Sequence, residues 1–208
     1  NLTGKLVYIS SDSFTGGTPS TAVQILNLET GETSTIFRAP EKAWIYYMSI
    51  SPDARQLVIS YIAPQQPGTL SNRALYIIPL DETELPQLLI TPPTADDHYV
   101  QAEWSADGKY IYFVHYNYND RPAGQLDPLY EIFRMAYPDG QPEKIVDNGF
   151  WPRISSDSSK LVYVSVDFVS GKNDLFLANA FRLINSSSKC VIRLSEVFEV
   201  ISLVSVGL

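Results

Sequence analysis

Residues 104–113, WSADGKYIYF, carry the clearest structural signal in this chain. Its centre, SADG, is a polar turn, and a run of aromatic and β-branched residues follows, which is typical of a strand. The Asp107 side chain can accept hydrogen bonds from backbone amides two residues on, and Gly108 suits a positive φ. The stretch therefore predicts a tight β-hairpin whose second strand follows Gly108.

The same arrangement recurs along the chain at near-equal intervals. When Lys5, Gln56, Lys109 and Lys160 are taken as equivalent, they lie 51, 53 and 51 residues apart. Each copy is followed by a third strand, and the first three copies also have a short fourth strand. We expect the third strands at 22–28, 74–80, 130–136 and 174–180, and the fourth at 33–37, 87–90 and 143–146. The sequence therefore predicts a unit of four antiparallel strands, repeated about every fifty residues.

The second strands are nearly continuous apolar runs, for example residues 110–114, and do not alternate between apolar and polar positions. Such runs are expected when both faces of a sheet are covered. Four-stranded units that stack with both faces buried describe a β-propeller better than a sandwich. Helical patterning is essentially absent, so the predicted fold class is all-β, a propeller of four repeats.

WSADGK at 104–109 resembles the W-S-P-D-G-K hairpin of the TolB-like, WD-type β-propellers, which also occurs in the propeller domains of prolyl-oligopeptidase-type peptidases. SPD at 51–53 is a partial match, and SSD at 155–157 is a weaker one. The resemblance implies an extracytoplasmic protein, periplasmic or secreted, although no signal segment is visible in the chain. It also implies a propeller over residues 1–180, with a tail at 181–208. The blades are expected at about 4–38, 44–91, 99–147 and 150–194.

Members of that family usually have about six blades, so four repeats leave open whether the ring closes. Residues 197–206 read as a strand and could supply the missing first strand of the first blade. Alternatively, residues 181–208 are the atypical end of a truncated larger propeller. An unclosed ring would expose edge strands and an apolar face, which predicts self-association as a homo-oligomer.

Charge and composition exclude several classes of partner. The chain has 208 residues, a net charge of −8 and a pI of about 4.7, which disfavours binding to nucleic acid or to an anionic membrane. No apolar run approaches the roughly 20 residues of a membrane-spanning helix. The single cysteine, Cys190, excludes an internal disulfide framework.

The sequence contains no Gly-x-Ser-x-Gly elbow and no phosphate-binding glycine loop, so we expect no catalytic residue and no cofactor. His98 and His115 lack a second histidine at metal-ligand spacing, and we expect no metal. Residues 96–98, DDH, are assigned to a solvated loop, and His115 is expected to pack among tyrosines. The alternative function is a hydrolase or lyase with a carboxylate or metal site in the central channel. Another is the non-catalytic fragment of a larger peptidase-like protein.

The long connections, between the second and third strands of each repeat and between successive repeats, should emerge on one face of the propeller. Variable loops on a rigid scaffold are where binding usually resides. We therefore predict a non-catalytic module that binds a protein or peptide through this long-loop face. Tyr116 and Tyr118 have an alternative role, packing on neighbouring blades, and the three tryptophans are expected in the core. The predicted contact residues, rich in the Tyr and Arg that favour interfaces, are His98, Tyr99, Tyr116, Tyr118, Asp120, Arg121 and Asp127.

Overall fold

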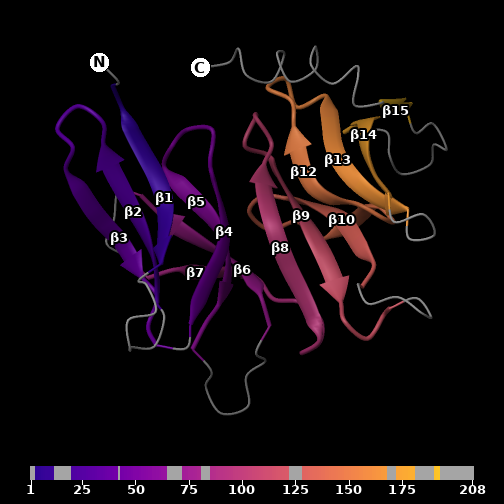
Figure 1. Cartoon of the computed structure of the whole chain (residues 1–208), viewed down its shortest axis with the longest axis horizontal. Coiled ribbons are helices and arrows are strands. Elements are labelled where there is room, and N and C mark those ends of the chain that lie inside the picture. Colours follow the sequence, from indigo (N-terminus) through magenta and orange to yellow (C-terminus); the bar gives the residue numbers. More distant parts are fainter. Residues whose placement is uncertain are drawn as a thin grey trace.

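A computed structural model of the chain describes residues 3–11, 20–41, 43–64, 72–80, 85–121, 128–167, 172–180 and 190–192. Within these residues there are fifteen strands and no helix. The strands form four antiparallel sheets that stand side by side in chain order, from indigo to orange in Figure 1. The all-β prediction is confirmed.

Each sheet is one blade, and its strands follow one another along the chain. Blade 1 has three strands and blades 2 to 4 have four each. Blade 1 contains β1 (Lys5–Ser11), β2 (Thr21–Asn27) and β3 (Thr33–Arg38), and blade 2 contains β4 (Trp44–Ile50), β5 (Gln56–Ile62), β6 (Ala74–Pro79) and β7 (Gln87–Ile90). Blade 3 contains β8 (Asp97–Trp104), β9 (Tyr110–Asn117), β10 (Tyr130–Ala136) and β11 (Glu143–Val146), and blade 4 contains β12 (Phe150–Ile154), β13 (Lys160–Asp167), β14 (Lys172–Asn179) and β15 (Cys190–Ile192).

The first strands of successive blades lie next to each other, since β8 contacts both β4 and β12. They form the inner edge of a partial propeller, and the sheets of the described residues do not close into a ring. The short turns that join β4 to β5, β8 to β9 and β12 to β13 lie at the upper side of Figure 1. Residues 197–206, the expected closing strand, lie outside the described residues. Self-association remains a prediction.

The hairpins form as predicted, but their alignment differs by one residue in the third repeat. In blades 2, 3 and 4 a serine hydroxyl accepts a hydrogen bond from the amide five residues later, at Gln56, Tyr110 and Lys160, with distances of 3.0, 2.9 and 2.9 Å. Tyr110, not Lys109, is therefore equivalent to Gln56. The Gly-Lys pairs at 108–109 and 4–5 are identical in sequence but occupy positions that differ by one residue, because the carbonyls of Gly4 and Lys109 are the equivalent ones.

Three apolar cores lie between consecutive blades. In β9, residues 111–114 are fully buried, because alternate side chains enter the cores toward blade 2 and toward blade 4. Two-sided burial is thus confirmed where a blade has two neighbours. Among the described residues, no helix is long and apolar enough to cross a membrane.

One tryptophan contradicts the expected core position. Trp104 is buried, but Trp151 is 53% exposed. Its backbone has a φ of 52° and lies in the irregularity of β12 between Phe150 and Arg153. That irregularity faces the inner edge, which the open arc leaves accessible.

Candidate functional site

An aromatic cluster lies where β8 begins and β9 ends, on the side of the long loops. His98 and Tyr116 are register partners on these strands. Their rings stack with centroids 4.9 Å apart. Tyr118, just beyond β9, packs edge-on against both rings, at 5.8 Å from His98 and 5.2 Å from Tyr116. The pairing of the two strands therefore brings together three of the predicted binding residues.

Arg121 joins this cluster through Tyr118. Its Nε donates a hydrogen bond of 2.6 Å to the Tyr118 carbonyl, and its guanidinium lies 5.7 Å from the ring centroid. The amide of Asp120 donates to the Asn117 carbonyl at 3.1 Å, which turns the chain back after β9. Tyr118 is 46% exposed, and Asp120 and Arg121 are also exposed. Asp127 lies outside the described residues.

Two predicted contact residues are buried instead. Tyr99 is 5% exposed and packs against Phe113 and His115 in the core between blades 2 and 3, because its side chain leaves β8 on the face opposite to His98. It cannot present a surface to a partner, so this part of the prediction is corrected. Tyr116 is also buried and contacts Tyr130, which is the packing role that the sequence left open. It supports the rings of His98 and Tyr118.

Sequence reasoning missed Arg73 and Tyr46, which complete the cluster from blade 2. Arg73 precedes β6, and its guanidinium lies 4.1 Å from the Tyr46 ring centroid and 5.9 Å from that of Tyr116. Such distances permit cation–π attraction. The available signal was the position of Arg73 at the end of a long connection assigned to the same face, but nothing in the sequence paired it with Tyr116.

A polar network crosses all four strands of blade 3. His115 of β9 lies between two carboxylates, with Nε2 2.9 Å from Asp97 Oδ1 and Nδ1 3.0 Å from Glu131 Oε2. Lys144 of β11 extends this network, with its Nζ 2.8 Å from Glu131 Oε1. Asp97 also accepts hydrogen bonds from Thr94 and Asn117. His115 thus packs as expected beside Tyr99, but its polar partners are carboxylates.

The network fixes the charge of its members. Burial disfavours ionisation of Asp97, but hydrogen bonds from Thr94, His115 and Asn117 outweigh it and lower its pKa to about 2. Burial likewise disfavours the His115 imidazolium, yet the hydrogen bonds to Glu131 and Asp97 prevail and raise its pKa. Asp97 begins β8 and is buried, so residues 96–98 are not the solvated loop predicted from the sequence. With both ring nitrogens engaged, His115 is not placed to act as a general base.

The inner edge carries a second polar row. Ser49, Glu103 and Arg153 oppose equivalent residues of the second strands in blades 2, 3 and 4. Arg153 lies 3.4 Å from Glu103, and the Trp104 amide donates to Ser49 Oγ at 3.4 Å. Burial raises the pKa of Glu103, and the positive charge of Arg153 opposes that rise. Glu103 thus contacts blade 4 at the position where a channel site was considered.

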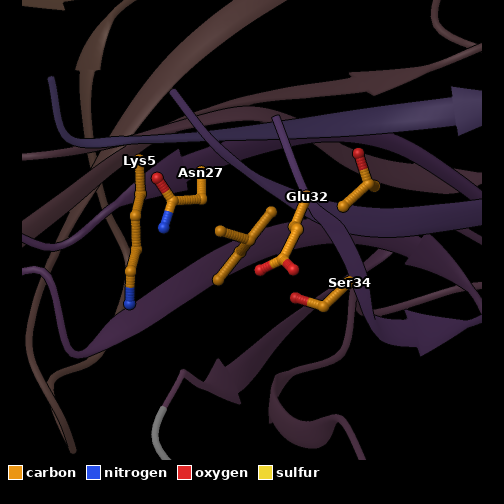
Figure 2. A pocket seen from close by; sticks show the side chains of 6 residues that line it. Lys5, Asn27, Glu32 and Ser34 are labelled. Carbon is orange, nitrogen blue, oxygen red and sulfur yellow. The ribbon is translucent and has the colours of Figure 1, made fainter. Parts of the chain in front are cut away.

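A cavity of about 530 Å³ lies on blade 1, at the end of β1 and β2 away from their long connection. Lys5 and Asn27 line one side, and Glu32 and Ser34 the other (Figure 2). No motif in the sequence predicted this cavity. In the part of the chain that the structure describes, no group of three or more His, Cys, Asp or Glu residues could hold a metal ion.

No protein-family model and no curated protein matches the sequence of this chain. Solved structures do match its fold. TolB from Acinetobacter baumannii has a TM-score of 0.62 at 17% identity, over 90% of this chain and 40% of its own. An oligogalacturonate lyase from Vibrio parahaemolyticus has a TM-score of 0.61 at 18% identity, over 90% of this chain and 50% of its own. The chain has the fold of a TolB-like β-propeller.

The fold extends to proteins of other activities. Hydrazine synthase from Kuenenia stuttgartiensis matches with a TM-score of 0.63 at 10% identity, over 86% of this chain and 31% of its own. The TolB-like propeller described here thus spans half or less of the length of these three structures. Because one fold serves TolB and named enzymes alike, the function must be argued from the side chains of this chain.

Proposed function

We propose that the chain is a non-catalytic propeller module that binds a protein or peptide through its long-loop face. The observation that carries this proposal is the cluster of His98, Tyr118 and Arg121, seated on the buried Tyr116 at the ends of β8 and β9. Exposed tyrosine and arginine side chains on a rigid support are typical anchors of protein interfaces. Asp120 and Asp127 belong to the same predicted surface.

The cluster is pre-organised, which favours a binding role. Tyr118 is fixed by two ring contacts, and Arg121 is fixed by its hydrogen bond to the Tyr118 carbonyl. Side chains that are already ordered lose less entropy when a partner binds. The state of His115 also favours binding over catalysis, because both of its ring nitrogens are engaged by carboxylates inside blade 3.

We further infer an extracytoplasmic location, periplasmic or secreted. This inference rests on the resemblance of the W-S-A-D-G-K hairpin to the TolB-like family and on the shared fold. Immunodetection of the full chain in cell fractions tests it, and recovery in the cytoplasm would overturn it.

The binding proposal is tested with a library of immobilised peptides, by measuring retention of the full chain. We expect Tyr118→Ala or Arg121→Ala to weaken retention of the peptides selected by the unmodified chain by about tenfold or more, the usual loss for an interface anchor. Tyr47→Ala is the matched control, because Tyr47 is exposed on β4 at the inner edge. Equal retention by all three variants and the unmodified chain, with unchanged thermal unfolding, would refute this surface.

A further inference from the structure

Arg73 is held at the boundary between blades 2 and 3 by its own main chain. Its amide donates a hydrogen bond to His98 Nδ1 at 3.2 Å, and its carbonyl accepts one from the Tyr99 amide at 2.8 Å. The residue is therefore tied to the start of β8, although it belongs to blade 2. Its position beside the long-loop cluster is fixed by two hydrogen bonds from the neighbouring blade.

The guanidinium of Arg73 has aromatic neighbours, and no described residue places an anion beside it. Its Cζ lies 4.1 Å from the Tyr46 ring centroid and 5.9 Å from that of Tyr116. Its Nε is buried and has no hydrogen-bond partner among the described residues, which also supply no ion pair to this side chain. Buried donors in native proteins are nearly always paired. An unpaired cation is still more unusual in a chain whose net charge is −8.

His98 supplies a second donor in the same cluster. Because its Nδ1 accepts the Arg73 amide, the proton of the neutral ring is on Nε2. Burial and the adjacent positive charge of Arg73 lower the pKa of His98, so the ring is neutral at pH 7. Its faces are enclosed by the stack with Tyr116 and the edge contact with Tyr118. The cluster thus combines one fixed cation and one neutral N–H donor with walls of tyrosine.

We propose that Arg73 and His98 form a carboxylate-binding subsite on the long-loop face, which takes an acidic side chain or the C-terminal carboxylate of a bound peptide. This proposal rests on the proposed function and specifies the chemical class of the ligand, a carboxylate. One face of the guanidinium lies against Tyr46 and its Nε is buried, so the two terminal nitrogens of this partly exposed side chain remain for a ligand. They match the two oxygens of a planar carboxylate. The tyrosine rings beside it suit an aromatic residue next to the acid.

The experiment uses the full chain and the same kind of peptide library. Each blocked peptide, acetylated and amidated, is synthesised with a central Glu and with Gln in its place. A third version carries Gln and a free C-terminal carboxylate. We expect the unmodified chain to retain one of the two acidic forms about tenfold better than the blocked Gln form, the usual worth of a charge-assisted pair. Which form it prefers distinguishes a side chain from a C-terminus.

Arg73→Gln should abolish this preference, and Arg73→Lys should reduce it, because lysine keeps the charge and loses the planar fork. The matched control is Arg55→Gln, since Arg55 is exposed in the short turn before β5 on the opposite face. It should keep the full preference. Thermal unfolding of each variant establishes that the fold is intact, and Arg73→Lys remains informative if Arg73→Gln is unstable.

Three results would overturn the proposal. Peptide retention without preference for either acid would refute the subsite and leave the proposed function standing. Retention of no peptide would refute both. Binding of trigalacturonate that is lost in Arg73→Gln, with no retention of acidic peptides, would reassign the subsite to a saccharide carboxylate.

Discussion

Blades 1 and 3 are built on the same repeat but differ in what surrounds them. Tyr8 in β1 and Phe113 in β9 occupy equivalent positions, because the strands begin after equivalent carbonyls, those of Gly4 and Lys109, which accept the amides of Leu28 and Tyr137. Phe113 is fully buried against blade 2. Tyr8 has no preceding blade beside it among the described residues, is half-buried, and its hydroxyl donates to Gln24 Oε1 at 2.6 Å. Burial in this fold is therefore set by the neighbouring blade and not by the strand alone.

The second difference is the inner strand. Blade 3 has β8, which contacts the inner strands on both sides and contributes Asp97 to the polar network. Blade 1 lacks an equivalent strand among the described residues, so its β1 forms the inner edge. The inner strand of blade 3 thus supplies both its contacts with the adjacent blades and the Asp97 carboxylate of its polar network. Blade 3 should be the most stable part of the molecule and blade 1 the least.

One matched pair of variants tests this order of stability. Phe113→Ala should lower the free energy of unfolding by about 3 to 5 kcal/mol, because it leaves a cavity between two packed blades. Tyr8→Ala should cost only about 1 kcal/mol, since it removes one part-buried hydrogen bond and half-exposed surface. Urea unfolding at equilibrium measures both. If Phe113→Ala does not fold, Phe113→Leu should cost about 1.5 kcal/mol. Equal losses at the two positions would contradict the comparison.

The next effect concerns the network that blade 1 lacks. His115→Phe should lower the free energy of unfolding by about 3 kcal/mol, because it removes the common partner of two carboxylates, the buried Asp97 and the partly buried Glu131. Lys144→Met is the control at the exposed end of the network and should cost less than about 1 kcal/mol. If Lys144→Met and His115→Phe lowered the free energy of unfolding equally, the exposed ion pair would contribute as much as the buried contacts of His115, which would contradict this prediction.

The same network predicts how stability depends on pH. The raised pKa of His115 means that its contribution is present below its ordinary pKa of 6.5 and is lost as the pH rises through its native value. The lowered pKa of Asp97 means that its contribution is present above 3.8 and is lost as the pH falls toward about 2. Stability should therefore peak between these limits, and His115→Phe should flatten the alkaline side of the profile. An unchanged profile would contradict a charged His115.

The features of the fold that depend on residues adjacent in the sequence could be predicted. The features that depend on the register between paired strands could not. Expected strands at 87–90, 130–136 and 143–146 match β7, β10 and β11. Hairpins and strands are indicated by patterns that involve only a few adjacent residues. The contact of His115 with Asp97, in contrast, depends on the irregularity in β8 between Val100 and Glu103, which sets the residues that oppose β9.

The candidate site divides in the same way. His98, Tyr116, Tyr118 and Arg121 were found because they flank one pair of antiparallel strands. Arg73 was missed because it approaches them from another blade, and two-residue periodicity carries no information about contacts between blades. Tyr99 was misplaced because adjacent strand residues point to opposite faces, and the sequence did not show which of them faced the core.

The smallest effect compares the hairpins of two blades that share the motif. Gly108 has a φ of 70°, and its equivalent in blade 2, Ala54, has a φ of 56°. A Cβ at Gly108 would meet only Pro52, at 3.9 Å, so Gly108→Ala tests the backbone without a clash. It should cost about 1 kcal/mol, whereas Ala54→Gly should gain about 0.5 kcal/mol, because relief of the left-handed conformation exceeds the added entropy of glycine in the unfolded chain. Thermal unfolding gives both changes. A loss of stability in Ala54→Gly would mean that the unfolded chain, and not the turn, decides how these hairpins differ.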